Sequence, residues 1–110
     1  MCMQVEIDEL LCQTAMRRAI EAGVGHLVEV RAGDVAEASF RDASVVVVFL
    51  VPSCLAALSP LLKEQCAPGT RVVAYKFPLP STGGWTPLAT AVTDDVVKKG
   101  AETNLYLYHM

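Results

Sequence analysis

Six short segments of the chain have the hydrophobic pattern of β-strands. They are apolar throughout, or alternate between apolar and polar residues, and cover residues 4–7, 26–31, 45–50, 70–77, 88–92 and 103–109. The third segment is almost wholly apolar and β-branched, which is typical of a strand covered on both faces. The chain is therefore expected to be built around a sheet.

Two stretches between these segments have helical spacing. In the first, Leu11, Ala15 and Ala19 recur every four residues, with Asp8 before them as a candidate N-cap. Gly23 follows as a candidate helix stop.

The second helical stretch carries leucines at helical spacing over residues 55–62. Pro60 lies inside this pattern, so the helix is expected either to kink there or to begin afresh with Ser59 as its cap. Strands that alternate with helices predict an α/β fold with a mostly parallel sheet. No helical pattern separates 88–92 from 103–109, so these two strands are expected to form an antiparallel hairpin at the C-terminal edge.

Length and composition restrict the possible function classes. The 110 residues predict one domain, residues 1–110. With 53% hydrophobic and only 19% charged residues, the chain is expected to cover apolar surface against a second chain or a missing piece of itself. The net charge of −3 disfavours a nucleic-acid partner held by phosphate contacts, and no apolar run is long enough to span a membrane.

The four cysteines, at positions 2, 12, 54 and 66, form no C-x-x-C pair, and the chain has only two histidines. This composition predicts no metal site. We expect free thiols that act mostly as small core residues in an intracellular, reducing compartment, cytoplasmic or mitochondrial.

Candidate binding residues follow the predicted strands, because open α/β sheets bind ligands beyond the carboxyl ends of their strands. Glu6 ends the first strand and could accept hydrogen bonds from both hydroxyls of a ribose. Asp34 follows the second strand and could accept from an exocyclic amine. The alternatives are an ordinary solvated carboxylate for Glu6 and a turn residue for Asp34.

Several stretches together resemble a known family. These are E-I-D, an A-x-x-R-A helix, VEVRAGDV, VVVVFLVPS and PGTRVVAYKFPLP, within residues 4–88. They are similar to the Rossmann-like core of class I S-adenosylmethionine-dependent methyltransferases. The likeness is greatest to small protein-lysine methyltransferases that act on a mitochondrial ATP synthase subunit or on the adenine nucleotide translocase.

The resemblance implies roles for particular residues. S-adenosylmethionine would be the cofactor, with its ribose on Glu6, its adenine ring on Ile7, and the amine of the adenine on Asp34 beside Val35. Further cofactor contacts would come from Phe49 and Leu50. The substrate cleft, which would receive a protein lysine, would be lined by Val51, Pro52, Ser53, Phe77 and Trp85. Trp85 has an equal alternative as a cap over the core.

The sequence departs from this family at its N-terminal side. Members carry a strand and a glycine-rich turn, E/D-x-G-x-G, before E-I-D, whereas only residues 1–3 precede Gln4 here. In the family's sheet that strand lies between the strands placed at 4–7 and 45–50. We therefore expect two half-sheets with unpaired inner edges, a partial methyltransferase domain that is inactive by itself, and possible self-association through the apolar edges.

Three functions remain open at this point. The first is the core of a methyltransferase acting on protein lysine. The second is a degenerate methyltransferase-like module that only binds a partner, as the missing glycine-rich turn would suggest. The third is half of a nicotinamide-dependent oxidoreductase, where an acid after the second strand would also serve. The V-F-L-V-P-S and F-P-L-P stretches favour the first over the third.

Overall fold

The computed structural model describes residues 2–110. The chain divides into two compact units, Met1–Ala38 and Ser39–Met110, which are described separately. The prediction of one domain over residues 1–110 stays a prediction.

The first unit is a strand–helix–strand crossover. Its elements are β1 (Cys2–Glu6), α1 (Glu9–Glu21), the 3-10 turn η1 (Gly25–Leu27), β2 (Val28–Ala32) and the 3-10 turn η2 (Val35–Glu37). β1 and β2 pair in parallel, with Glu6 opposite Ala32. The predicted crossover is therefore confirmed, although His26 lies in η1 and not in the strand.

Both predicted ends of the first helix are confirmed. The carboxylate of Asp8 accepts hydrogen bonds from the amides of Leu10 at 2.9 Å and Leu11 at 3.3 Å. These amides have no partner within the helix, so the cap satisfies them. After the helix, Gly23 has φ +77°, a left-handed conformation that glycine adopts without steric cost.

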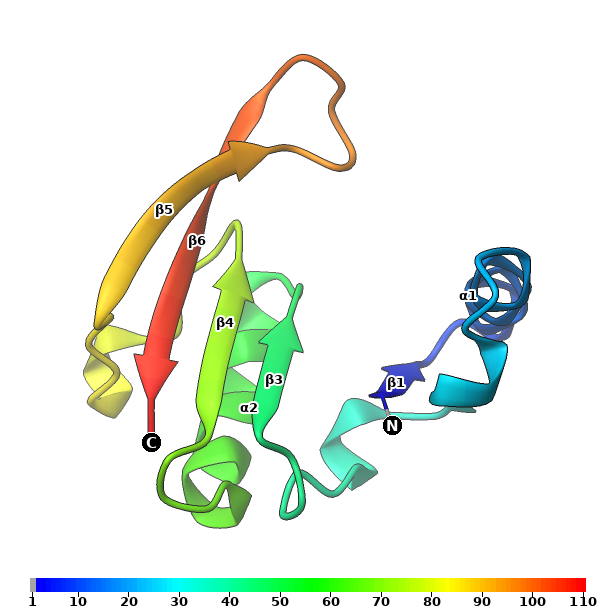
Figure 1. Cartoon of the computed structure of the whole chain (residues 1–110). Helices are drawn as coiled ribbons and strands as arrows, with labels where there is room; N and C mark the ends of the chain where they lie inside the picture. The colour runs from blue at the N-terminus through cyan, green and yellow to red at the C-terminus, as the bar shows by residue number, and fades with distance from the viewer. Residues whose placement is uncertain (1) are drawn as a thin grey trace. The chain divides into compact units, whose positions relative to one another are not determined.

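The second unit contains the larger sheet. Its elements are β3 (Val45–Val48), α2 (Pro52–Gln65), β4 (Arg71–Tyr75), the 3-10 turn η3 (Ser81–Gly83), β5 (Ala89–Asp94) and β6 (Glu102–His109). The strand order is β3-β4-β6-β5. β3 and β4 are parallel, whereas β6 is antiparallel to both of its neighbours. The predicted α/β fold with a parallel sheet and an antiparallel C-terminal hairpin is confirmed (Figure 1).

One face of this sheet packs on α2 (Figure 1). Leucines of the helix and residues of three strands form this core, in which the following are buried: Leu55, Leu58, Leu62, Val46, Val48, Val72, Ala74 and Tyr108. The expectation that residues 45–50 are covered on both faces is wrong for this unit. Val45 is 42% and Val47 68% exposed, because α2 is the only α-helix described in the unit and it covers one side.

α2 runs without interruption through Pro60, so the predicted fresh start at Ser59 is wrong. Proline lacks the amide that would bond to the carbonyl four residues earlier, which here is that of Ala56. The hydroxyl of Ser59 donates to this same carbonyl at 3.4 Å. The orphaned acceptor is thus satisfied from within the helix.

The expectation of two half-sheets is confirmed for residues 2–110. β1 pairs only with β2, and β3 pairs only with β4, so each lies at an edge of its own sheet.

The expectation of mostly buried cysteines is half right: Cys12 and Cys66 are buried, whereas Cys2 and Cys54 are exposed. Burial raises the pKa of the Cys66 thiol. Burial, together with the charges of Glu6 and Asp8, raises that of Cys12.

Candidate functional site

Two predicted cofactor residues lie at the carboxyl ends of the paired strands β1 and β2 in the first unit. The amide of Gly33 donates to the carbonyl of Glu6 at 2.9 Å, which extends the parallel ladder one step beyond Ala32. Asp34 follows directly. Glu6 and Asp34 therefore lie at the same end of the same pair of strands, as the sequence predicted.

Glu6 is half-buried and Ile7 beside it is 73% exposed. One carboxylate oxygen of Glu6 accepts from the amide of Asp8 at 3.2 Å. A carboxylate offers about four acceptor positions, so this bond leaves acceptor capacity for hydroxyl groups of a ligand. An exposed isoleucine next to such a carboxylate fits an aromatic ring attached to a sugar.

Asp34 is exposed and directly precedes the turn η2. Its carbonyl accepts from the amide of Glu37 at 3.0 Å, which holds Val35 within the turn. This arrangement agrees with the alternative of a turn residue, and a turn residue with an exposed carboxylate can also contact a ligand. The cofactor role of Asp34 and Val35 stays a prediction.

The second unit carries the remaining predicted cofactor residues, Phe49 and Leu50, directly after β3. Val51 then forms the N-cap of α2, with Pro52 and Ser53 in its first turn. Phe49 and Val51 are 47% and 54% exposed. Exposed apolar side chains thus lie at the carboxyl end of β3, and the cofactor and substrate roles of these five residues stay predictions.

Phe49 packs against Tyr75, with ring centroids 4.6 Å apart. Tyr75 is the last residue of β4, and its hydroxyl accepts from the amide of Val96 at 2.7 Å and donates to the carbonyl of Asp94 at 3.3 Å. The contact therefore joins three segments at one end of the sheet. The sequence did not indicate Tyr75, because each contact links residues about twenty or more positions apart.

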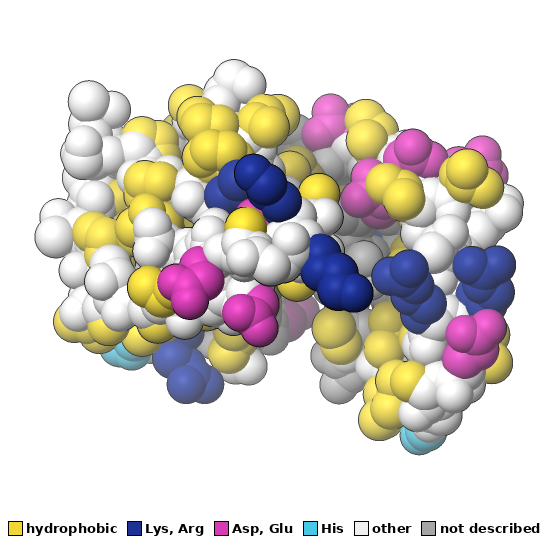
Figure 2. Space-filling view, turned by 90° about the horizontal axis from the view of Figure 1, so that it is seen from above, with side chains coloured by type: hydrophobic (Ala, Val, Ile, Leu, Met, Phe, Trp, Pro, Cys, Tyr) yellow, Lys and Arg dark blue, Asp and Glu magenta, His cyan; other side chains and the backbone are white. Residues whose placement is uncertain are grey.

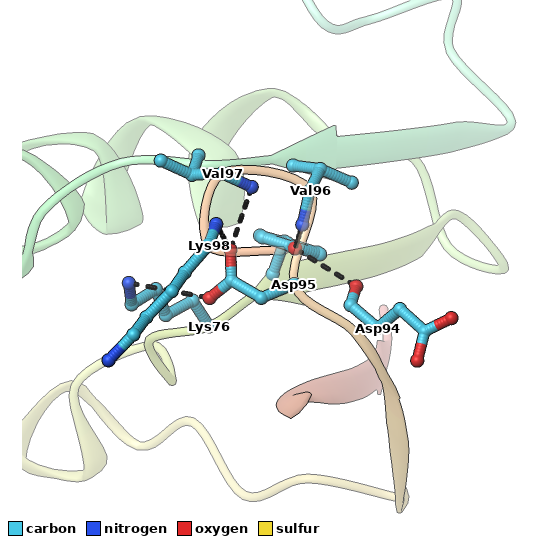
Figure 3. Close-up of polar contacts among 7 residues, drawn as sticks. Lys76, Asp94, Asp95, Val96, Val97 and Lys98 are labelled. Carbon is cyan, nitrogen blue, oxygen red and sulfur yellow. Dashed lines mark hydrogen bonds and ion pairs between the residues drawn. The ribbon is translucent and has the colours of Figure 1, made fainter. Parts of the chain in front are cut away.

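A polar cluster of Lys76, Asp95 and two loop amides lies in the segment that Tyr75 contacts (Figure 3). The side chain of Asp95 is only 5% exposed and accepts from the amides of Val97 at 2.8 Å and Lys98 at 3.0 Å. Lys76 approaches it with its ammonium group at 3.7 Å. An aspartate that bonds amides two and three residues ahead is a known turn signal, so the D-D-V-V-K-K run could have indicated this turn.

The backbone amides of Lys98 and Val97 hold the pKa of Asp95 below its ordinary value of 3.8, and Lys76 adds to this effect. A folded-state pKa below the unfolded one stabilises the fold above pH 3.8 and ceases to do so as the pH falls through the folded value. Asp95→Asn, which keeps the amide acceptor but loses the charge, should therefore lower the Tm at pH 7. The difference from wild type should shrink on acidification.

Thermal unfolding between pH 7 and pH 2 measures this difference. Asp94→Asn is the matched control, since its carboxylate points away from the cluster (Figure 3). A Tm difference between wild type and Asp95→Asn that does not depend on pH would show that the charge of Asp95 has no part in stabilising the turn.

Phe77 and Trp85, predicted for the substrate cleft, occupy different environments. Phe77 is half-buried just after β4, where its amide donates to the carbonyl of Tyr75 at 2.9 Å. Trp85 is 6% exposed and makes an edge-to-face contact with Tyr108, with 5.5 Å between ring centroids. Lys63 lies over its ring at 5.3 Å. This burial agrees with the alternative of a cap over the core, and the substrate role of Trp85 stays a prediction.

Figure 2 shows basic and acidic side chains interspersed with hydrophobic ones on the face seen from above. Over residues 2–110, no group of three or more His, Cys, Asp or Glu side chains is placed to hold a metal ion. No helix in the described part of the chain is long and apolar enough to cross a membrane.

Comparison with known proteins identifies the family. The family model described as the ANTKMT methyltransferase domain matches residues 1–89. The chain belongs to this methyltransferase family. Membership removes the oxidoreductase alternative and confirms the resemblance seen in the sequence.

Two curated relatives of this ANTKMT-family chain are lysine methyltransferases. A protein-lysine N-methyltransferase of Saccharolobus islandicus is 30% identical over 91 residues, which are 83% of this chain and 55% of that protein. The adenine nucleotide translocase lysine N-methyltransferase of Mus musculus is 37% identical over 87 residues, which are 79% of this chain and 37% of that protein. The chain thus spans about half or less of the length of these relatives.

Solved structures agree on the fold. The crystal structure of an RNA methyltransferase from Salinibacter ruber in complex with S-adenosyl-L-homocysteine is 38% identical, with a TM-score of 0.81 over 97% of this chain and 63% of that one. The Bacillus subtilis tRNA methyltransferase TrmK has a TM-score of 0.72 at 13% identity, over 97% of this chain and 48% of that one. At that identity the likeness concerns the fold alone.

Proposed function

We propose that the chain is part of an S-adenosylmethionine-dependent methyltransferase that methylates a protein lysine. The observation that carries this proposal is the pair of acids, Glu6 and Asp34, at one end of parallel strands in a chain of the ANTKMT family. The names of the two curated relatives support lysine as the acceptor.

The residues at the carboxyl ends of β1 and β2 fit the cofactor. S-adenosylmethionine supplies an activated methyl group when it is bound. Glu6 has a carboxylate available to ribose hydroxyls, Ile7 offers an exposed apolar surface to the adenine, and Asp34 and Val35 lie just after the end of the neighbouring strand β2. The family resemblance also assigns Phe49 and Leu50 to the cofactor; in the second unit they lie directly after β3.

The chain's own part in the reaction is to bind and orient. Methyl transfer to an amine is a direct displacement, so alignment and exclusion of water matter more than a dedicated nucleophile. The apolar surface formed by Phe49, Val51 and Pro52 would exclude water from the cleft, and Ser53 and Phe77 would border the acceptor. No residue is assigned as a general base.

We further propose that sequence N-terminal to this chain completes the cofactor site, and that residues 1–110 alone are inactive. Two observations support this. The relatives are longer than the matched region, and β1 and β3 each have an unpaired edge. A strand followed by a glycine-rich turn, as the family resemblance implies, would cover an unpaired edge of this kind. The same unpaired edges, with the exposed Val47 on β3, would let the 110-residue chain associate with itself.

RNA is the second candidate acceptor, because the Salinibacter structure described as an RNA methyltransferase is 38% identical. The net charge of −3 gives the 110 residues no excess of basic groups for phosphate contacts. Transfer of labelled methyl groups into separated protein and RNA fractions distinguishes the two acceptors.

Four free cysteines support a reducing intracellular compartment, cytoplasmic or mitochondrial.

Thermal unfolding with and without S-adenosylhomocysteine tests the proposal. Binding stabilises the folded state by mass action, by about 2.7 kcal/mol at a ligand concentration 100 times the Kd. A chain extended with the in-frame sequence upstream of Met1 should be stabilised, and the 110-residue chain should not. No shift in the extended protein would instead support a degenerate module that only binds a partner.

A further inference from the structure

Tyr75 contacts two segments that meet at the carboxyl end of the larger sheet. Its ring packs on Phe49 with 4.6 Å between centroids and an interplanar angle of 50°. Its hydroxyl accepts a hydrogen bond from the amide of Val96, in the β5–β6 loop (residues 95–101). The same hydroxyl donates to the carbonyl of Asp94, the last residue of β5. One side chain thus joins a predicted cofactor residue to a loop that the proposed function does not use.

The residue after Tyr75 holds the same loop by a different contact. Lys76 approaches the carboxylate of Asp95 at 3.7 Å, and that carboxylate binds two amides of the loop (Figure 3). Lys76 has φ +74°, a conformation that costs a residue other than glycine free energy. Hydrogen bonds on both sides fix it, from its own amide to Asn104 at 2.8 Å and from Phe77 to Tyr75 at 2.9 Å.

The loop is held in place although its two valine side chains do not join the core. Val96 is 77% and Val97 74% exposed, so burial of these side chains does not offset the entropy lost in ordering the loop. The contacts of Tyr75 and Asp95 offset that loss and present two valines at the surface. An ordered loop that presents two exposed valines at the carboxyl end of β4 is suited to contact a ligand.

We propose that Tyr75 is a positioning residue that couples the β5–β6 loop to Phe49, so that this loop borders the acceptor side of the methyl-transfer cleft. The acceptor-side role rests on the proposed function. The coupling between Phe49 and the loop does not, and it can be measured without any ligand.

Amide hydrogen exchange of the 110-residue chain tests the coupling. The exchange rate of Val96 is compared with that of Val72, a buried β4 residue that reports on global unfolding. Tyr75→Phe keeps the ring but removes the hydroxyl, and should raise the Val96 rate about fivefold relative to Val72, as expected for the loss of one hydrogen bond. Phe49→Ala should also raise it, because Tyr75 then lacks its packing partner.

Val47→Ala is the matched control, since Val47 is an exposed residue of β3 whose side chain has no role in this contact. It should leave the ratio unchanged. An unchanged ratio in Phe49→Ala, or equal increases at Val96 and Val72, would overturn the coupling.

Label transfer from S-adenosylmethionine into total cell protein tests the acceptor-side role, using the extended protein. Tyr75→Phe should leave the KM for S-adenosylmethionine within twofold of wild type and lower the transfer rate at least fivefold. A rise in this KM with an unchanged rate at saturation would overturn the acceptor-side role. Absence of transfer by the wild type would refute the proposed function, whereas the exchange result would still stand.

Discussion

Replacing Tyr108 with alanine is expected to lower the free energy of unfolding by about 3–5 kcal/mol, the usual cost of truncating a buried aromatic residue. Tyr108 is 2% exposed on β6 and packs edge-to-face against Trp85. It lies opposite Val72 in the sheet, so these two buried side chains share one face of it. Truncation would leave a cavity that these well-packed neighbours cannot close. Chemical denaturation of the 110-residue chain measures the change.

Tyr108→Phe separates the hydroxyl from the ring. The hydroxyl accepts from the buried amide of Leu79 at 2.9 Å, so its removal leaves that amide unpaired and should cost about 1–3 kcal/mol. Val92→Thr, at a 63% exposed position of β5, is the control and should change stability by less than about 0.5 kcal/mol. A loss below about 1 kcal/mol for Tyr108→Ala would mean that this core does not hold the sheet together.

Replacing Glu6 with alanine is expected to weaken binding of S-adenosylhomocysteine about tenfold to a hundredfold in the extended protein. Hydrogen bonds to a charged group contribute about 1.5–3 kcal/mol, and the ribose hydroxyls would lose their acceptor. Isothermal titration calorimetry measures the Kd. Glu6→Gln, which keeps the shape but not the charge, should show a smaller loss.

Glu21→Ala is the matched control for this experiment, because Glu21 is an exposed glutamate at the far end of α1. Its affinity should equal that of the wild type. Equal affinities of Glu6→Ala and wild type would refute the role assigned to Glu6.

Local features of the fold could be predicted because their causes lie within a few residues. Asp8 precedes the helix it caps, and Gly23 follows it. The alternation of short apolar runs and helical stretches predicted the crossover units. The fresh start at Pro60 was wrong because the substitute donor, Ser59, acts on a carbonyl that only the helical conformation brings near.

The candidate site could be predicted only in part. The topology of parallel strands placed Glu6 and Asp34 at one edge, and the sequence pattern was sufficient for that. Tyr75 was missed because its partners, Phe49 and the β5–β6 hairpin, lie about twenty or more residues away. The turn at Asp95 has a local sequence signal, but its contact with Lys76 links residues far apart in the chain. The exposure of Val47 was missed because an apolar strand does not reveal which of its faces is covered by the same chain.

The central claim is that residues at the carboxyl ends of β1 and β2 bind the cofactor. NMR of the isotope-labelled extended protein, titrated with S-adenosylhomocysteine, tests it most directly. The account predicts saturable shifts of the amides of Glu6, Ile7 and Asp34, with little change at the control residue Glu21. Saturable binding that leaves these three amides unshifted, or no binding at all, would contradict it.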